Sequence, residues 1–526
     1  AEFADKEVSL VFDGAMANAQ VYLDGVLLGG HKDGYTPFEI RLTGRIKPAG
    51  SLLTVHVDGR ENPDIPPFGG QIDYLTYAGI YREVWLKITD PIAIRNVKIE
   101  TPEVLAPEKS VSATIYLANP QDLPISGSLQ AELRCPRGRV LAQQVLDLQG
   151  AETQLRFDAL SGITLWSPDT PALYQLHLQL QVGDSRDDWQ QNFGFRHAEF
   201  TPEGFKLNGA RVKLIGLNRH QSFPYSGYAQ GRASQEGDAE ILKRDLACNI
   251  VRTSHYPQSK WFLDHCDRIG LMVLEEIPGW QHIGGAAWQD EAVENVRRMI
   301  TRDWNHPSII LWGVRINESD DDDAFYSRTN TLARQLDPSR QTGGIRKHTE
   351  SSLLEDVYTF NDFIMGDFEA PGSNRPRTAL RDQQEVTGLP HKVPYLVTEY
   401  NGHMFPTKVQ DQEQRQMEHV TRHLDVLNAA YGDDSIAGCI GWCMFDYNTH
   451  KDFGSGDRIC HHGVMTLFRE PKFAAYAYAS QGSPDSKVVL KPVTYWARGE
   501  RNIGGTLPLM ILTNCDQVQL RFDDGQ

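Results

Sequence analysis

The sequence predicts a multidomain chain in which a jelly-roll β-sandwich and an immunoglobulin-like β-sandwich precede a (β/α)8 TIM barrel and the start of a further β domain. Three observations predict this order. A chain of 526 residues is too long for a single hydrophobic core. Short alternating apolar runs separated by turns fill its first part, which is typical of antiparallel sandwiches. Buried apolar runs then alternate with helical segments, which indicates a parallel α/β core.

The two sandwiches are expected over residues 1–90 and 91–196. Asp-Gly, Gly-Gly and Pro-rich turns separate the strands of the first, and the second has the length of an immunoglobulin-like module, about a hundred residues. The chain begins without Met and close to an expected strand, so we expect the jelly roll to be incomplete at its N-terminus, and a signal peptide cannot be judged. The expected strands are Val8 to Phe12, Gln20 to Leu23, Leu52 to Val57, Val111 to Leu117, Gly127 to Leu133 and Leu173 to Val182.

The barrel is expected over residues 197–482. Eight short, mainly apolar runs can be counted there as buried strands. A helix is expected at Ala239 to Ala247, and the alternation of strands and helices predicts a closed barrel. The expected strands are Val212 to Ile215, Ile250 to Arg252, Leu271 to Leu274, Ile309 to Val314, Thr342 to Ile345, Val357 to Phe360, Tyr395 to Thr398 and Ile436 to Met444.

After the barrel, residues 483–526 return to a β pattern. Strands are expected at Tyr495 to Arg498, Leu507 to Leu512 and Val518 to Phe522. This segment therefore predicts the start of a C-terminal β domain.

The composition argues against several classes of partner. A net charge of -17 argues against nucleic acid, because phosphate binding relies on clustered Lys and Arg. No apolar run approaches the roughly 20 residues of a membrane-spanning helix, so no membrane partner is expected. Seven scattered cysteines without a CxxC pair argue against a disulfide framework or a zinc site. The bacterial cytoplasm and the periplasm stay open, as do a monomer and a homo-oligomer.

Polar residues follow most of the expected barrel strands. In such barrels the C-terminal strand ends form the rim of the active site, so we expect these residues to meet there. They are Asn218, Arg219 and His220; Ser254 and His255; Glu275 and Glu276; Asn317 and Glu318; Asn361 and Asp362; Glu399; and Asp446.

Two glutamates of this set are placed for the cleavage of a glycosidic bond. Glu318 and Glu399 each follow an apolar run, at the ends of the fourth and seventh expected strands. Cleavage needs one carboxyl group to protonate the leaving oxygen and another to attack, or to activate water, on the opposite face. A non-catalytic carbohydrate-binding protein, the alternative from another functional class, needs neither.

Several segments, in matching order along nearly the whole chain, resemble glycoside hydrolases of family 2, which include β-galactosidases, β-glucuronidases and β-mannosidases. One resembles the closing signature of that family's jelly roll, others the end of its immunoglobulin-like domain, its barrel entrance and its first two barrel strand ends. These segments are Tyr77 to Val84, Trp166 to Tyr174, Phe193 to Arg196, Asn218 to His220 and Arg252 to Pro257.

The resemblance implies a retaining glycosidase of the β-galactosidase type. It makes Glu318 the general acid/base and Glu399 the nucleophile of a covalent glycosyl-enzyme, with Asn317 holding the sugar 2-hydroxyl. The two carboxyl groups are then expected about 5 to 5.5 Å apart. Glu318 is expected to have a raised pKa and Glu399 a lower one, so that one is protonated and the other charged.

The resemblance also assigns five further contacts with substrate or nucleophile. Asp73 matches a carboxylate that the jelly roll sends to the sugar, although an Asp in a surface turn is the alternative. His220 and His255 match imidazoles of the sugar pocket, with structural histidines as the alternative. Trp442 matches an aromatic wall, and Tyr358 matches a tyrosine that hydrogen-bonds the nucleophile, with a core tyrosine as the alternative.

Two departures from the family pattern bear on substrate and cofactor. Glucuronidases place Asn-x-Lys before a glycine where this chain has Cys460-His461-His462, so a neutral His462 favours a β-galactoside or a galactosyl oligosaccharide as substrate. A glucuronide or galacturonide stays open through a protonated His462 or through other nearby groups. Those groups are Asn448, Lys451 and Arg458. Where many relatives bind Mg²⁺ through Glu-x-His, this chain has Trp280-Gln281-His282, so no metal or other cofactor is expected to be required.

Overall fold

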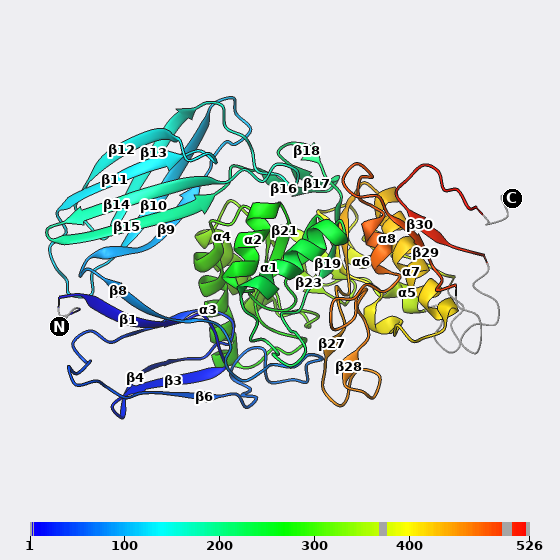
Figure 1. Cartoon of the computed structure of the whole chain (residues 1–526), viewed down its shortest axis with the longest axis horizontal. Helices are drawn as coiled ribbons and strands as arrows, with labels where there is room; N and C mark the ends of the chain where they lie inside the picture. The colour runs from blue at the N-terminus through cyan, green and yellow to red at the C-terminus, as the bar shows by residue number, and fades with distance from the viewer. Residues whose placement is uncertain (1–2, 4, 368–375, 497–507, 522–526) are drawn as a thin grey trace.

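The computed structural model describes residues 3, 5–367, 376–496 and 508–521 (Figure 1). Two β-sandwiches lie one above the other at the N-terminal end of the molecule in Figure 1, and the barrel lies beside them. A closed eight-stranded barrel that follows β-sandwich domains confirms the predicted fold class. Within the described residues, no helix has both the length and the apolar character needed to cross a bilayer.

The first sandwich packs two three-stranded antiparallel sheets against each other. Strand β1 lies between β5 and β8 in one sheet, and β3 lies between β4 and β6 in the other. Val8 and Leu10 of one sheet share a core with Val21 of the other. The three strands expected here are confirmed, with ends that differ by at most two residues. The strands are β1 (Glu7–Phe12), β2 (Ala15–Met16), β3 (Asn18–Leu23), β4 (Val26–His31), β5 (Phe38–Arg41), β6 (Leu53–Asp58), β7 (Gly79–Ile80) and β8 (Val84–Thr89).

The second sandwich packs a sheet of strand order β13-β10-β9 against one of order β12-β11-β14-β15. Buried and less buried residues alternate along its central strands, so each strand presents one apolar face to the shared core. The three strands expected here are confirmed by β10, β11 and β14, although β14 begins one residue after the expected Leu173. The strands are β9 (Ala93–Glu100), β10 (Lys109–Ala118), β11 (Gly127–Arg134), β12 (Val140–Leu148), β13 (Glu152–Leu160), β14 (Tyr174–Val182) and β15 (Ser185–Phe193).

A small sheet joins the second sandwich to the barrel. It consists of β16 (Ala198–Thr201), β17 (Gly204–Leu207) and β18 (Ala210–Arg211). Its Phe200 and Phe205 pack in one apolar cluster with Leu214, Ile250 and Met272, which lie at or near the start of barrel strands. This cluster fills the N-terminal end of the barrel. The C-terminal strand ends are therefore the end at which a site can open.

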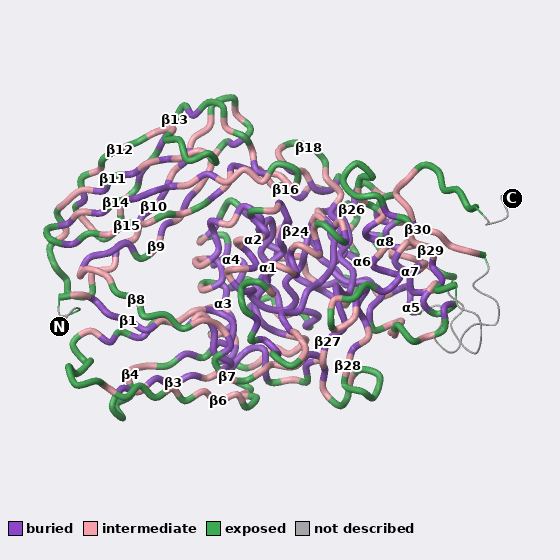
Figure 2. The backbone as a smooth tube through the Cα atoms, viewed as in Figure 1, coloured by how far each residue is buried: buried purple, intermediate pink, exposed green. Residues whose placement is uncertain are grey.

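The barrel consists of eight parallel strands, β19 to β26, as predicted. Nearly all of their residues are buried, and Figure 2 shows the buried segments concentrated in the barrel. The eighth strand ends at Gly441, three residues before the expected Met444. The strands are β19 (Leu214–Asn218), β20 (Ile250–Arg252), β21 (Met272–Glu276), β22 (Ile309–Gly313), β23 (Gln341–Arg346), β24 (Val357–Asn361), β25 (Tyr395–Glu399) and β26 (Ile436–Gly441).

Helices connect the barrel strands and cover the outer face of the barrel (Figure 1). The helix expected at Ala239 to Ala247 is divided, because α1 ends at Glu240 and the π-helix η1 continues over the next five residues. The helices are α1 (Arg232–Glu240), η1 (Ile241–Asp245), α2 (Lys260–Ile269), α3 (Ala286–Asp303), α4 (Asp323–Leu336), α5 (Ile364–Asp367), α6 (Gln383–Thr387), η2 (Gly402–Met404), α7 (Glu413–Gly432) and α8 (Ala475–Ala479).

Two short hairpins follow the barrel: β27 (Tyr447–Asn448) with β28 (Ile459–Cys460), and β29 (Leu490–Pro492) with β30 (Ile511–Thr513). The strand expected at 495–498 is wrong at 495 and 496, and its other two residues lie outside the described part. The strand expected at 507–512 is observed only from residue 511, and residue 507 is also outside. Residues 518–521 form no strand, and residue 522 is outside the described part.

A buried ion pair joins several elements at the N-terminal end of the barrel. Nδ1 of His306 lies 2.6 Å from Asp267 Oδ2, and Asp267 Oδ1 accepts from the backbone N–H of Ser308. The Asp267 carbonyl accepts from the indole N–H of Trp166, which lies between β13 and β14 of the second sandwich. Burial lowers the pKa of His306, but the carboxylates of Asp267 and Asp303 outweigh it and raise this pKa to about 9.

The protonated form of His306 should therefore stabilise the fold in a pH-dependent way. Its folded-state pKa lies above the unfolded value, so the contribution is complete below about pH 6.5 and is lost as the pH rises through about 9. At most it amounts to about 3 kcal/mol, from about 1.4 kcal/mol per pKa unit. We expect His306→Gln to destabilise the protein in urea more at pH 6 than at pH 9.5. The exposed His348→Gln is the control, and a loss that is independent of pH would contradict this role.

Candidate active site

Three of the expected rim residues, His255, Glu318 and Glu399, line a cavity of about 420 Å³ at the C-terminal ends of the barrel strands. Four carboxyl groups, three imidazoles and three large aromatic rings line it. They belong to Asp73, Glu318, Glu399 and Asp452; His255, His403 and His462; and Trp280, Trp442 and Phe453. No lysine or arginine is among the described residues that line this cavity. The site is therefore acidic and aromatic.

The guanidinium of Arg252, at the end of β20, organises the floor of the site. It is fully buried, donates 3.0 and 2.8 Å hydrogen bonds to the two oxygens of Glu276, and lies 2.5 Å from Glu399 Oε1. It also donates to the side-chain oxygens of Asn218, at 3.0 Å, and of Asn317, at 2.9 Å. Five barrel strands or their following loops therefore meet at one cation. The sequence indicated Arg252 only as part of a motif, and it indicated Glu276 only as a rim residue.

Glu399, the last residue of β25, is buried against this cation. Burial raises its pKa to about 8, Arg252 lowers the pKa, and the negative charge of Glu318 raises it again. The expectation of a low pKa for Glu399 is wrong, because the loss of hydration outweighs the adjacent cation. Arg252 is the group that favours the charged form, which is the form that attacks as a nucleophile.

Glu318 lies in the loop after β22 and is held by two side-chain amides. Gln281 Nε2 donates to one carboxylate oxygen at 2.9 Å, and Asn361 Nδ2 donates to the other at 3.0 Å. The backbone of Glu318 has a φ of +55°, an uncommon conformation for a residue other than glycine, and such strain clusters at functional sites. No pattern in the sequence indicated Gln281 as the partner of Glu318.

Asn317 lies between the two glutamates. Its side-chain oxygen accepts from Arg252, which also binds Glu399, and Asn361 donates to both Asn317 and Glu318. The buried Nδ2 of Asn317 has no hydrogen-bond partner in the described part of the chain. Because a buried donor without a partner is costly, this amide is free to bind a ligand hydroxyl.

Asp73 reaches the site from the first sandwich. The hydroxyl of Tyr447 donates to its Oδ2 at 2.8 Å, and Thr449 binds its backbone carbonyl. Burial raises the pKa of Asp73 to about 7; the Tyr447 bond lowers it, and the charge of Glu318 raises it. Its buried Oδ1 has no partner among the described residues. Asp73 is thus a lining residue of the cavity and not a surface-turn residue.

The two expected pocket histidines lie in different positions. His255 lines the cavity and stacks on Trp442, with ring centroids 5.2 Å apart. His220 lies behind them, hydrogen-bonded to the Tyr256 hydroxyl at 2.9 Å and edge-on to Trp442, and it is not among the described lining residues. Burial lowers the pKa of both histidines well below the ordinary value, so both rings are neutral. Trp442 itself lines the cavity, as expected of an aromatic wall.

His462 lines the cavity as a neutral imidazole. Its Nδ1 lies 3.3 Å from both Trp442 Nε1 and the Tyr447 hydroxyl. Burial lowers its pKa well below the ordinary value, and neighbouring His403 and Lys472 lower it further. A protonated His462 is therefore disfavoured. Lys451 and Arg458, two proposed sources of positive charge, have exposed side chains and are not among the described lining residues.

Tyr358 lies outside the site, and its expected bond to the nucleophile is wrong. Its hydroxyl lies 3.5 Å from the Val386 carbonyl, and its ring stacks on Tyr395 in the core between barrel and helices. Side chains alternate along a strand, so Tyr358 and Phe360 face outward, whereas Asn361 at the strand end faces the site. Tyr358 is thus a core tyrosine.

The segment from Trp280 to His282 contributes to the site through several contacts. Trp280 lines the cavity, Gln281 binds Glu318, and the His282 ring lies against the loop at Gly69. Among the described residues, one group of potential metal ligands comes close together. It consists of Asp264, Asp267 and His306, none of which lines the cavity.

Comparisons with known proteins agree with this geometry. The model of the TIM barrel domain of glycosyl hydrolases family 2 matches residues 199–484, and a second model of glycosyl hydrolases family 2 matches residues 92–196. A β-galactosidase of Thermoanaerobacterium thermosulfurigenes is 56% identical over 99% of this chain, and one of Rhizobium meliloti is 54% identical over 93%. The chain spans 72% and 66% of the lengths of these two relatives.

Among solved structures, a β-glucuronidase of Parabacteroides merdae superposes with a TM-score of 0.82 at 22% identity, over 97% of this chain and 69% of that one. This likeness supports the fold alone. The assignment to a family rests on the two family models and on the two relatives that are 56% and 54% identical. The chain belongs to glycosyl hydrolase family 2, and it is a glycoside hydrolase.

Proposed function

We propose that the chain is a retaining exo-β-galactosidase that hydrolyses terminal β-D-galactosyl residues by double displacement. In the first step, the Glu399 carboxylate attacks the anomeric carbon while Glu318 donates a proton to the leaving oxygen. In the second step, Glu318 takes a proton from water, which attacks the same carbon and releases Glu399. The contact of Glu399 with Arg252, and the two amides that hold Glu318, support this division of roles.

Two buried polar atoms that have no hydrogen-bond partner among the described residues, Asn317 Nδ2 and Asp73 Oδ1, are available to bind the sugar. The Asn317 amide next to both glutamates is placed to donate to the 2-hydroxyl group. Asp73 offers its free Oδ1 to hydroxyl groups at the far end of the ring. Trp442, stacked on His255, offers an apolar face to the ring carbons.

The described residues that line the cavity include no lysine or arginine, and this favours a neutral sugar over a uronate. Recognition of a carboxylate relies on a fixed cation, and none lines the cavity within the described residues. His462, at the position where glucuronidases place a lysine, is held neutral by burial. The β-galactosidase names of the two relatives with 56% and 54% identity support galactose among the neutral sugars.

A panel of nitrophenyl β-glycosides tests the sugar. Galactose, glucose, mannose, glucuronate and galacturonate are compared by kcat/KM. We expect the galactoside to be the best substrate and to exceed both uronides at least tenfold, since one missing charge-assisted bond is worth about that factor. A uronide that exceeds the galactoside would overturn the choice of sugar and leave the roles of the two glutamates unaffected.

Arg252 is the cation that favours the anionic form of Glu399, so its removal should change how the activity depends on pH. Arg252→Met removes the positive charge, so the pKa of Glu399 rises further above its ordinary range. Since the nucleophile must be deprotonated, we expect kcat/KM to fall at least tenfold and its acid limb to move up by about one to three pH units.

The matched control is Arg219→Met. Arg219 is equally buried and is paired with Asp238 at 2.7 Å, but it does not contact either catalytic carboxylate. Its replacement should lower stability and leave the acid limb in place, and Arg252→Lys should restore part of the limb's position. An acid limb that Arg252→Met leaves unchanged would contradict the role of this guanidinium.

A further inference from the structure

Gln281, in the loop after β21, is fixed beside the catalytic cavity by its backbone. Its φ of +60° is uncommon for a residue other than glycine. Its backbone N–H donates to the Asn317 carbonyl at 2.7 Å, and the preceding Trp280 forms a parallel bridge with Asn317. The loop is therefore joined to the residue that directly precedes Glu318.

A loop of the first sandwich holds the same segment from another side. The His282 ring lies against this loop, because a Cβ atom at Gly69 would overlap the ring and one at Gly70 would lie 3.0 Å from His282 Cβ. Gly69 has a φ of +114°, a conformation that favours glycine. The ring also packs edge-on against Trp288 of α3, whose indole N–H donates to the Phe68 carbonyl at 2.9 Å. His282 is thus held between the first sandwich and α3.

The side chain of Gln281 extends from this fixed backbone to the acid/base. Its Nε2 donates to Glu318 Oε2 at 2.9 Å, and Asn361 Nδ2 donates to the other carboxylate oxygen at 3.0 Å. An amide N–H donates and cannot accept, so both amides favour the charged carboxylate over the protonated acid. The negative charge develops on Glu318 as its proton moves to the leaving oxygen, so the Gln281 bond strengthens during this transfer.

We propose that Gln281 is a positioning residue for the acid/base, and that the first sandwich fixes Gln281 through His282. This role rests on the proposed function, because it acts on the proton that Glu318 donates. The contribution of Gln281 grows as the leaving oxygen becomes more basic, because a basic oxygen must be protonated in order to leave. The first sandwich therefore acts at both ends of the site: it places Asp73 in the cavity, and it supports the transfer of the proton to the leaving group.

Two galactosides that differ only in the leaving group test the role of Gln281. Phenyl β-galactoside needs a proton from the acid, whereas dinitrophenyl β-galactoside releases a stable anion that does not. Gln281→Met keeps the length of the side chain and removes the amide. We expect kcat/KM to fall about tenfold with the phenyl substrate, the worth of one hydrogen bond to a charged group, and to stay within about twofold with the dinitrophenyl substrate. The basic limb of the pH profile with the phenyl substrate should move up by about one pH unit, because a carboxylate that loses a donor holds its proton more firmly.

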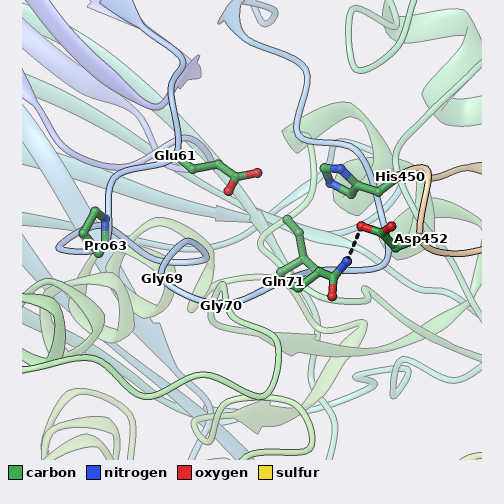
Figure 3. A pocket seen from close by; sticks show the side chains of 8 residues that line it. Glu61, Pro63, Gly69, Gly70, Gln71, His450 and Asp452 are labelled. Atoms are coloured by element: carbon green, nitrogen blue, oxygen red, sulfur yellow. Dashed lines mark hydrogen bonds between the residues drawn. The ribbon is translucent and has the colours of Figure 1, made fainter.

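His282→Ala tests the link to the first sandwich. It leaves the Gln281 amide in place but removes the ring that fills the space above the glycines, so we expect a selective loss with the phenyl substrate of about threefold. Gln71→Ala is the matched control. Gln71 Nε2 donates to Asp452 Oδ2 at 2.8 Å across the same domain boundary, as Figure 3 shows, but this bond does not involve Gln281 or Glu318. The ratio of the two kcat/KM values should stay at the wild-type value in this variant.

Glu318→Ala, measured with the same two substrates, separates failure of the positioning role from failure of the proposed function. If Glu318→Ala lowers both substrates equally, the acid/base assignment fails, and the role of Gln281 fails with it. If Glu318→Ala is selective for the phenyl substrate but Gln281→Met is not, the positioning role is overturned and the proposed function stands. A ratio that His282→Ala leaves unchanged would overturn the link to the first sandwich. If the panel shows that wild type prefers another sugar, the phenyl and dinitrophenyl glycosides of that sugar give the same test.

Discussion

The buried guanidinium of Arg252 is the constraint on which the rest of the site depends. A fully buried cation is tolerated only when it is paired and hydrogen-bonded, and here two carboxylates and two amide oxygens satisfy it. These partners come from different barrel strands or from the loop after one, so the charge can be satisfied only when the barrel is closed. The same contacts bring Asn317 and Glu399 to one cation, so a requirement of folding also arranges the groups that we propose act on the sugar.

The first sandwich completes the site, and hydrogen bonds across the domain boundary join it to the barrel. Arg82 of this sandwich donates to the Pro257 carbonyl and to the Gln221 side chain of the barrel domain, both at 2.9 Å. Asp73 is delivered to the catalytic cavity across this boundary, held by Tyr447. Gln71 Nε2 also donates to Asp452 Oδ2 across this boundary, at 2.8 Å. A barrel without the sandwich would therefore keep its glutamates and lose one end of its sugar pocket.

Much of this could be predicted from the sequence. Barrel strands buried on both faces leave runs of apolar residues, and the positions of Glu318 and Glu399 after such runs place both at the C-terminal rim. The partners of Arg252 could not be predicted, since Glu399 is 147 residues away and only the closed barrel brings them together. The orientation of Tyr358 could be predicted from strand geometry. Side chains along a strand point alternately to opposite faces, so if Asn361 faces the site, Tyr358 three residues earlier faces away from it. The pKa of Glu399 depends on burial, which residue types alone do not give.

The central claim is that Glu399, paired with Arg252, forms a covalent bond to the sugar. A 2-deoxy-2-fluoro-β-galactoside with a dinitrophenolate leaving group forms such an intermediate quickly and releases it slowly, because the fluorine disfavours the positively charged transition states of both steps. Mass spectrometry of the digested protein should find one fluorogalactosyl group, located on the peptide residue Glu399. A label on Glu318 or Glu276, or continued turnover of the galactoside with no label, would contradict the account.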